Sequence, residues 1–286
     1  MTDTASATTY HDVRYRVDDP VATVTLSRPE RLNAFTGRML LEMAHAVAQA
    51  ERDERVVGIV LTGEGRGFCA GADMEMLRSV SAGEGRAGEA FAGDLPSPGA
   101  EEMGDEFKVG YAYLMAVRKP ILAAINGPCA GLGFAIALLC DLRFASDHAV
   151  FTSAFANRGL IAEHGTSWIL PRLVGPANAL DILWSGRKFD AEEALRLGAV
   201  NRVVPHDELM AQATGYLRGL AQTSAPRSLM IMKQQVYRHL NATLGPALRE
   251  SIELMNESLT REEFREGVAS FLEKRPPAFP RIGSAG

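Results

Sequence analysis

Apolar runs separate a strand-rich first part of the chain from a helical last part. Alternating and apolar positions at 13–17 and 21–26 flank Asp18-Asp19-Pro20 and predict a hairpin. Short continuous apolar runs at 58–62 and 121–125 predict buried strands, because a strand covered on both faces needs no alternation. Helical patterns lie between these strands. The order strand–helix–strand therefore predicts an α/β fold with parallel pairing.

Helical patterns follow recognisable start signals. Thr36 is placed to cap a helix that runs to Arg52 with apolar residues on one face. A short helix is expected from Met74, and another over 107–117. Asp190 begins a further helix, with Glu193 at capping-box spacing and Gly198 as its stop. After a last strand at 200–204, the remaining pattern is helical, over 207–221, 226–240, 246–259 and 262–272.

These patterns divide the chain into three parts. Residues 1–12 are polar and are expected to form a disordered leader, 13–205 the α/β core, and 206–286 a helical C-terminal appendage. Residues 79–105 hold several glycines and acids with little periodicity, which predicts a mobile surface loop.

Composition excludes several classes of function. The formal charge of −5 provides no basic field for nucleic acid or an anionic membrane surface. No apolar run reaches the roughly 18 residues of a membrane span. Three cysteines without C-x-x-C spacing indicate reduced thiols in a cytoplasmic protein. We therefore expect a cytoplasmic protein with neither a nucleic-acid nor a membrane partner.

Two turns of small residues carry the candidate chemistry. Asn126 to Gly133 follow one buried strand, and FCAGAD at 68–73 follows another. Small residues let a ligand approach the backbone, and the first amides of a helix lack intrahelical partners. Such amides can hold a negative oxygen, and two turns could aim two of them at one point. The alternative is that the glycines only allow close packing.

Other catalytic signatures fail. After Gly131-Leu132-Gly133, the third small residue of a dinucleotide-binding fingerprint would be Ile136. The sequence has no G-x-S-x-G elbow and no cluster with metal-ligand spacing. A nucleotide-dependent dehydrogenase, a serine hydrolase and a metal centre are therefore not expected.

The order of the motifs resembles the crotonase family, also called the enoyl-CoA hydratase/isomerase superfamily. The segments that carry the resemblance are LSRPERLNAF, FCAGAD, NGPCAGLG…CD, GLIAEHGTSWILPRLVG and FDAEEALRLGAVNRVVP. The resemblance implies a crotonase-like spiral of ββα units with a C-terminal helical trimerisation region. It also implies a homotrimer or a dimer of trimers, and an acyl-CoA thioester substrate. Coenzyme A would arrive on that substrate, so no separate cofactor is expected.

Matching positions assign roles by resemblance. The two oxyanion amides fall at Ala70 and Leu132. The residues that match coenzyme A-binding positions are Arg31, Leu32, Ala34, Ala72, Asp73 and Met74. In relatives the tail reaches the coenzyme A of a neighbouring subunit, and the matching residues here are Phe279 and Arg281. Trp168 and Trp184 are expected in the core or a pocket wall, and Asp141 at an ordered helix end.

The acid–base residues depart from the family pattern. The two glutamates of hydratases are replaced by Ala135 and Phe155, and a third acidic position matches Glu163. Burial would raise the pKa of Glu163 towards that of a general base. Alternatively, Glu163 is a cap or pairs with Arg158 or Arg172. His164 is more simply a packed or surface histidine than an assistant.

The leading expectation is an enoyl-CoA hydratase or isomerase that stabilises a thioester enolate. A dehalogenase, decarboxylase, hydrolase or C–C lyase acting on a CoA thioester stays open, since one fold hosts many reactions. An acid from the 79–105 loop could complete the site, the candidates being Asp94, Glu101 and Glu102. A non-catalytic acyl-CoA binder is the alternative of a different class.

Overall fold

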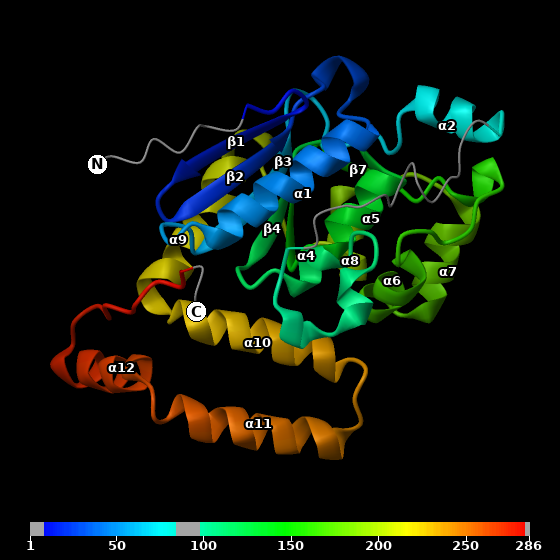
Figure 1. Cartoon of the computed structure of the whole chain (residues 1–286). Helices are drawn as coiled ribbons and strands as arrows, with labels where there is room; N and C mark the ends of the chain where they lie inside the picture. Colours follow the sequence, from blue (N-terminus) through cyan, green and yellow to red (C-terminus); the bar gives the residue numbers. More distant parts are fainter. Residues whose placement is uncertain (1–8, 84–97, 284–286) are drawn as a thin grey trace.

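A computed structural model describes residues 9–83 and 98–283, and its central element is a six-stranded sheet (Figure 1). The strand order is β1-β2-β3-β4-β6-β9. The strands are β1 (Val13–Asp18), β2 (Val21–Leu26), β3 (Gly58–Gly63), β4 (Ile121–Ile125), β6 (Leu142–Ser146) and β9 (Arg202–Val204). β1 and β2 form the predicted antiparallel hairpin, and all later neighbours pair in parallel. The α/β prediction is confirmed.

Helices cover both faces of this sheet. On one face lie α1 (Gly37–Arg52) and the apolar α5 (Leu132–Leu139), and on the other lies α9 (Leu209–Thr223) (Figure 1). α9 places Leu209, Ala213 and Leu217 against the sheet, since a spacing of four residues keeps side chains on one helix face. Thr36 caps α1 as predicted, and its Oγ1 accepts the Met39 amide at 3.1 Å.

A second sheet of three short strands holds the second glycine-containing turn. It contains β5 (Cys129–Ala130), β7 (Val150–Thr152) and β8 (Phe189–Asp190). β5 lies between β4 and α5 in sequence, so its pairing with β7 anchors the glycine turn from outside the central sheet. Beyond it come η4 (Ala156–Arg158), α6 (Thr166–Val174), α7 (Pro176–Ser185) and α8 (Ala191–Leu197). Asp190 caps α8 as predicted.

The segment between β3 and β4 differs from its prediction. The expected helix over 107–117 is instead η3 (Asp105–Lys108) and α4 (Tyr113–Ala116), which are separated by Gly110 at φ +56°. A residue in that left-handed region ends a right-handed helix. α2 (Met74–Ser81) and η2 (Glu101–Met103) occupy the ends of the loop predicted over 79–105. Its middle, 84–97, lies outside the described residues.

The predicted C-terminal helical region, 206–286, contains α9, α10 (Pro226–His239), α11 (Leu244–Ser258) and α12 (Glu262–Glu273) (Figure 1). Because α9 packs against the central sheet, it belongs to the core and not to a separate appendage. α10 is attached to the core by a cluster in which Asp141 binds Lys233 and Tyr237. α11 and α12 leave large apolar side chains exposed, namely Leu244, Leu248, Ile252, Met255, Leu259, Phe264, Val268, Phe271 and Leu272. Asp141 also accepts the Ile121 amide, so it joins β4 to α10 rather than ordering one helix end.

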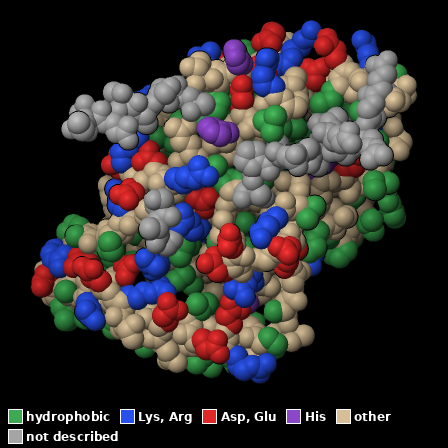
Figure 2. Space-filling view, in the orientation of Figure 1, with side chains coloured by type: hydrophobic (Ala, Val, Ile, Leu, Met, Phe, Trp, Pro, Cys, Tyr) green, Lys and Arg blue, Asp and Glu red, His purple; other side chains and the backbone are tan. Residues whose placement is uncertain are grey.

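The surface carries charges of both signs. Acidic and basic side chains are interspersed over the face shown in Figure 2. No helix within the described residues has the length and apolar character needed to cross a membrane. Tyr10 donates a hydrogen bond to Gln49 and Asp12 is buried against Arg38, so these two residues of the predicted disordered leader are ordered. Residues 1–8 lie outside the described part.

Candidate functional site

The two glycine-containing turns meet at the end of the central sheet. A Cβ added to Gly133 would lie 2.6 Å from the Cβ of Cys69, so only glycine allows α5 to approach the first turn this closely. A Cβ added to Gly71 would lie 3.7 Å from the Leu132 nitrogen. The backbones of Cys69 and Cys129 also pair in an isolated parallel β-bridge, and both thiols are free. The predicted convergence of the two turns is therefore present in the structure.

The amides of the first turn are not equivalent. The Ala70 amide donates to the Leu32 carbonyl at 2.9 Å, and the Asp73 amide donates to the Phe35 carbonyl at 2.9 Å. The Gly71 amide faces the Cys69 sulfur at 3.4 Å. Within the described part of the chain, the Ala72 amide has no hydrogen-bond partner. The assignment of Ala70 as an oxyanion donor is therefore wrong in this conformation, and Ala72 provides the available amide.

The second turn leaves the predicted amide available. Leu132 is the first residue of α5, so its amide has no partner within the helix. The preceding Gly131 amide donates to the Thr152 carbonyl at 3.1 Å. Gly131 adopts φ +51°, which turns the chain from β5 into α5. Leu132 therefore starts a helix with an amide that has no partner in residues 9–83 and 98–283, as the prediction requires.

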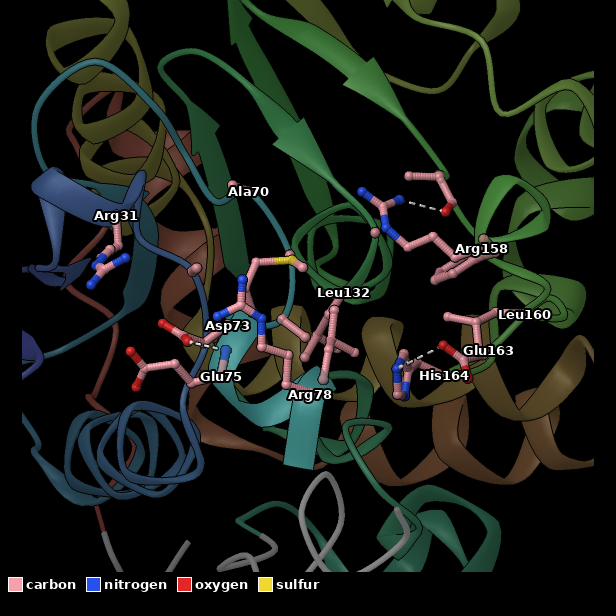
Figure 3. A pocket seen from close by; sticks show the side chains of 18 residues that line it. Arg31, Ala70, Asp73, Glu75, Arg78, Leu132, Arg158, Leu160, Glu163 and His164 are labelled. Carbon is pink, nitrogen blue, oxygen red and sulfur yellow. Dashed lines mark hydrogen bonds and ion pairs between the residues drawn. The ribbon is translucent and has the colours of Figure 1, made fainter. Parts of the chain in front are cut away.

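Both amides lie on a cavity of about 490 Å³ (Figure 3). Of the predicted site residues, those on its wall are Arg31, Ala34, Ala70, Ala72, Asp73, Met74, Leu132 and Glu163. Leu32 is not among the described lining residues. It serves the site indirectly, since its carbonyl accepts the Ala70 amide. Most of the site residues that the motifs predicted therefore lie on the wall of this one cavity.

Glu163 lies in the turn between η4 and α6. The Thr166 amide and hydroxyl both donate to the Glu163 carbonyl, at 3.0 and 2.7 Å, and so hold this turn. Its side chain is 32% exposed and reaches the cavity wall. Burial raises the pKa of the Glu163 carboxyl above its ordinary value. This direction favours a general base, although the extent of exposure keeps the effect modest.

The arginines proposed as structural partners of Glu163 bind elsewhere. Arg158 donates to the Ala154 carbonyl, and Arg172 donates to the Trp168 carbonyl while its guanidinium lies 4.1 Å from the centre of the Trp168 ring. Among the described residues, neither arginine forms an ion pair with Glu163. The carboxylate is therefore not neutralised by the cations that the sequence suggested.

His164 is a distinctive neighbour of Glu163. Its Nε2 lies 3.7 Å from a Glu163 carboxylate oxygen, and its backbone adopts the left-handed φ of +56°. Burial lowers the pKa of His164 to about 4, so the imidazole is neutral at pH 7 and the contact is not an ion pair. The histidine is packed, as the simpler sequence interpretation held, but it also lines the cavity.

The positions of the two missing glutamates are apolar in the structure. Ala135 is fully buried in α5, and Phe155 forms part of the cavity wall. The carboxylates on the described wall are Asp73, Glu75 and Glu163. Glu101 and Glu102 are not among the described lining residues, while Asp94 lies outside the described part. Figure 3 shows Glu75 beside Asp73, on the opposite side of the cavity from Glu163.

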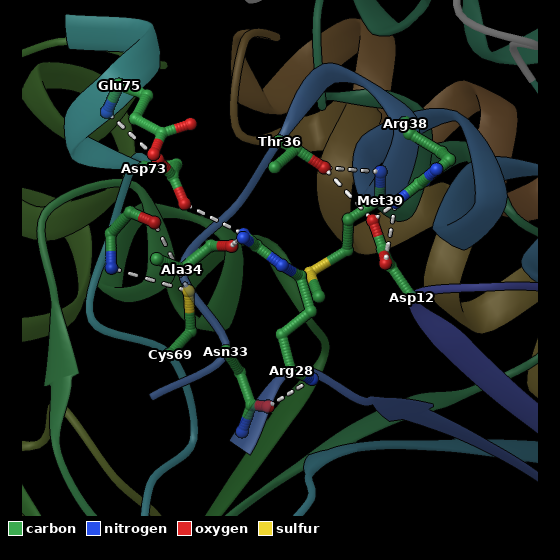
Figure 4. A network of polar contacts seen from close by, with 11 residues as sticks. Asp12, Arg28, Asn33, Ala34, Thr36, Arg38, Met39, Cys69, Asp73 and Glu75 are labelled. Atoms are coloured by element: carbon green, nitrogen blue, oxygen red, sulfur yellow. Dashed lines mark hydrogen bonds and ion pairs between the residues drawn. The ribbon is translucent and has the colours of Figure 1, made fainter. Parts of the chain in front are cut away.

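Arg28 ties the loop before α1 to the first turn (Figure 4). Its Nη1 lies 2.9 Å from Asp73 and 2.7 Å from the Ala34 carbonyl, and its amide donates to Asn33. Asp73 also caps α2 by accepting the Glu75 amide. Although burial acts to raise it, these contacts hold the pKa of Asp73 below its ordinary value. Asp73 is therefore an ionised structural anchor.

Several lining residues were missed by sequence reasoning. They are Glu75, Leu77 and Arg78 on α2, together with Ala154, Arg158 and Leu160 around η4. The sequence predicted α2, but which of its sides faces the cavity depends on the tertiary packing. No group of three or more His, Cys, Asp or Glu residues that could hold a metal occurs in residues 9–83 and 98–283.

The tail and the tryptophans lie away from this wall. Phe279 packs near Gly267, and Arg281 binds Asp19 and the Arg55 carbonyl. Neither tail residue is among the described residues of the cavity. Trp168 packs against the core, in line with the expectation. Trp184 is 73% exposed, so its placement in the core was wrong, although it borders a separate apolar cavity.

Comparisons with known proteins identify the family of the chain. The enoyl-CoA hydratase/isomerase family model matches residues 16–281. The probable enoyl-CoA hydratase echA8 of Mycobacterium bovis is 32% identical over 95% of this chain and 98% of its own length. The 1,2-epoxyphenylacetyl-CoA isomerase of Escherichia coli is 34% identical over 92% of this chain and 96% of its own.

Solved structures show the same fold. An enoyl-CoA hydratase subunit from Geobacillus kaustophilus superposes with a TM-score of 0.81 at 33% identity, covering 94% of this chain and 98% of that one. An enoyl-CoA hydratase described as putative, from Streptomyces coelicolor, has a TM-score of 0.81 at 29% identity and covers 98% of each chain. The chain therefore belongs to the enoyl-CoA hydratase/isomerase family and has the crotonase fold, as its motifs predicted.

Proposed function

We propose that this protein isomerises the double bond of an enoyl-CoA, with the Ala72 and Leu132 amides holding the thioester oxygen and Glu163 moving the proton. The observation that carries the proposal is the isolation of Glu163. Of the wall carboxylates, Asp73 is bound to Arg28, Glu75 lies on the opposite side, and the hydratase positions are Ala135 and Phe155.

One carboxylate is sufficient for this reaction. Glu163 takes a proton from C2 of a 3-enoyl thioester, and the electrons of that C–H bond move into a dienolate. The carbonyl oxygen gains negative charge, which the two amides stabilise more strongly than the neutral carbonyl. Glu163 then returns the proton to C4, so the double bond moves from C3–C4 to C2–C3. No second acid is consumed or required.

The rest of the cavity suits the coenzyme A part of the substrate. Arg31, Arg78 and Arg158 place positive charge around it, as a diphosphate requires. Ala34, Asp73 and Met74 line the same wall and fit the role assigned by resemblance. The exposed apolar faces of α11 and α12 support the proposal that copies of the chain assemble into a trimer or a dimer of trimers.

Hydration of a 2-enoyl-CoA is the second candidate, because the relative from Mycobacterium bovis carries the name of a probable enoyl-CoA hydratase. Absorbance of the conjugated 2-enoyl thioester separates the two reactions. Isomerisation predicts a rise in this absorbance with trans-3-hexenoyl-CoA. Hydration predicts a fall with trans-2-hexenoyl-CoA.

If the protein turns over neither trans-3-hexenoyl-CoA nor trans-2-hexenoyl-CoA, both reactions are refuted. Calorimetric binding of hexanoyl-CoA by such an inactive protein would favour another CoA-thioester reaction or the non-catalytic binder. A panel of halogenated, carboxylated and saturated acyl-CoAs would then separate these alternatives.

A further inference from the structure

A groove of about 500 Å³ lies between the β1–β2 hairpin and α9. α9 packs on β3, β4 and β6, and Val21 is the hairpin residue that joins this buried cluster. The remaining residues on that face of the hairpin line the groove together with one side of α9. None of the described lining residues belongs to the cavity that contains Glu163 (the Glu163 cavity), so the groove is a separate space.

The register of the hairpin places an arginine beside a threonine twice. Side chains two residues apart on a strand point to the same face, so Arg14 and Arg16 both stand over the groove. Arg14 lies opposite Thr25, and Arg16 lies opposite Thr23. Both threonines are half-buried, and within the described part of the chain neither hydroxyl has a hydrogen-bond partner. Two guanidinium groups and two available hydroxyls therefore face one space.

Two of the arginines that line the groove are held in place by neighbours. Arg14 donates to the Ser27 hydroxyl at 3.1 Å and pairs with Glu64 at 2.9 Å. Arg218, which reaches the groove from α9, pairs with Asp18 at 2.6 Å. Because a guanidinium carries five N–H donors, each of these arginines keeps donors for a ligand after these contacts.

Arg16 is the uncompensated charge of the groove. Along β1 it stands between Arg14 and the pair of Asp18 with Arg218, and its exposed side chain has no ion pair or hydrogen bond among residues 9–83 and 98–283. Like charges on neighbouring positions of a sheet destabilise it, so a bound anion would relieve this repulsion. The whole chain carries a formal charge of −5, so the positive groove is a local feature and not a basic face.

The size and the second wall of the groove define the kind of anion. Its volume falls within the range of about 300–1,000 Å³ that is usual for sites of small organic molecules. Met210 and Ala211 place apolar surface on the α9 wall, across from the arginines. Planar guanidinium forks and hydroxyls match the several acceptor oxygens of a phosphate group.

We propose that this groove binds a small organic phosphate monoester. Arg16 contacts the phosphate, and Arg14 and Arg218 flank it. The hydroxyls of Thr23 and Thr25 donate from the floor, while the organic part lies against the α9 wall. The site is additional to the proposed reaction and does not depend on it, because the groove and the Glu163 cavity have no described lining residue in common.

Calorimetric titration of the full chain with phenyl phosphate tests the site. Saturable binding is expected, and Arg16→Gln should weaken it by about tenfold or more, because hydrogen bonds between charged groups are lost. Thr23→Val removes one hydroxyl and should weaken binding by about two- to tenfold. Thermal melting confirms that each variant is folded. Absence of saturable binding to the wild type, or equal binding by Arg16→Gln, overturns the inference.

Two further arginines provide controls. Arg52→Gln removes an exposed charge from α1, outside the described lining of the groove, and should bind phenyl phosphate as the wild type does. Arg31→Gln removes a charge from the Glu163 cavity and should also leave this binding unchanged. A loss in Arg52→Gln as large as that in Arg16→Gln would reveal only general charge attraction and overturn the inference. A loss confined to Arg31→Gln would place the phosphate in the Glu163 cavity and overturn it as well.

Two simpler ligands separate the parts of the probe. Benzyl alcohol lacks the anion and should not bind at the groove. Inorganic phosphate lacks the organic part and should bind more weakly than phenyl phosphate. Equal affinity for inorganic phosphate and phenyl phosphate would overturn the assignment of an organic ester, and equal affinity for benzyl alcohol and phenyl phosphate would overturn the role of the arginines.

Discussion

The Ala70 amide nitrogen lies 2.9 Å from the Leu32 carbonyl oxygen, and this hydrogen bond joins the loop before α1 to the turn at 68–73. Leu32 has a left-handed φ of +48° in that loop. The Ala70 amide is engaged by Leu32, and the Asp73 amide donates to the Phe35 carbonyl. Of these three residues, Ala72 lines the cavity with an amide that has no partner among the described residues. The loop therefore determines which backbone donor the site offers.

Replacing the proposed base should abolish turnover but spare binding. Glu163→Gln keeps the shape of the side chain and removes its ability to accept a proton, so kcat for 3-enoyl-CoA isomerisation should fall by about 10²–10⁴. Binding of hexanoyl-CoA, measured by calorimetry, should stay close to that of the wild type. Glu75→Gln makes the same chemical change on the opposite wall and should leave kcat nearly unchanged. Equal losses in the two variants would contradict the assignment.

The pH dependence of activity follows from the environment of Glu163. Because burial raises the pKa of its carboxyl above 4.5, kcat/KM should increase with pH along a limb centred above that value. A limb centred at or below 4.5 in steady-state assays would contradict this prediction. Glu163→Gln should lack the limb in its residual activity.

The same raised pKa predicts that the ionised Glu163 carboxylate lowers the stability of the folded protein at neutral pH. The folded protein holds the Glu163 proton more tightly than the unfolded chain does, so stability is lost as pH rises from 4.5 through the folded pKa. Glu163→Gln should therefore melt higher than the wild type at pH 7, and the difference should shrink near pH 4. His164, with its pKa lowered to about 4, loses stability as pH falls, but it does so in both proteins. Equal melting temperatures at pH 7 would contradict a raised pKa of Glu163 in the folded protein.

Close approach of the two turns should make Gly133 irreplaceable. Its φ is not in the left-handed region, so Gly133→Ala acts only through the contact of the new Cβ with Cys69 at 2.6 Å. Overpacking of this kind costs about 1–3 kcal/mol in the free energy of unfolding and should displace the Leu132 amide, lowering kcat. Gly215→Ala in α9, where nothing lies within 4 Å, should instead stabilise by about 0.5–1 kcal/mol. Urea unfolding of both variants compares their free energies of unfolding. A Gly133→Ala protein as stable as the wild type would refute the prediction.

Attachment of the C-terminal helices should depend on one buried ion pair. Lys233 Nζ lies 2.7 Å from Asp141 with only 7% of its side chain exposed, and it also donates to the Leu114 and Lys119 carbonyls. Lys233→Met leaves Asp141 poorly compensated and should cost about 3–5 kcal/mol in urea unfolding. Arg218→Met breaks an exposed pair with Asp18 and should cost at most about 1 kcal/mol. Similar costs for the two would show that burial is not the deciding factor.

Local signals allowed much of the fold to be predicted. Continuous apolar runs at β3 and β4, and the caps at Thr36 and Asp190, depend on neighbouring residues only, and they appear as expected. The helix predicted over 107–117 failed because Gly110, at φ +56°, interrupts an otherwise helical pattern. A single glycine signals such a break only weakly, since helices tolerate it at a cost of about 1 kcal/mol.

The site was predictable to the level of the turn but not of the single atom. The motif FCAGAD indicated a donor-bearing bend, and GLIAEHG indicated the acid. Choosing between the amides of Ala70 and Ala72 requires knowing that Leu32 and Phe35 pair with this turn. Those contacts join segments more than 35 residues apart, as does the pair of Arg28 with Asp73. A single sequence contains no record of such long-range pairing.

The most direct measurement compares Leu132→Pro with Leu132→Ala in the isomerase assay. Proline removes the amide proton yet suits the first position of a helix, while alanine keeps the proton and shortens the side chain. If this amide stabilises the enolate oxygen, kcat should fall by about 10²–10³ in Leu132→Pro and stay near the wild-type value in Leu132→Ala, with hexanoyl-CoA binding retained in both. A folded Leu132→Pro protein with wild-type kcat would contradict the account.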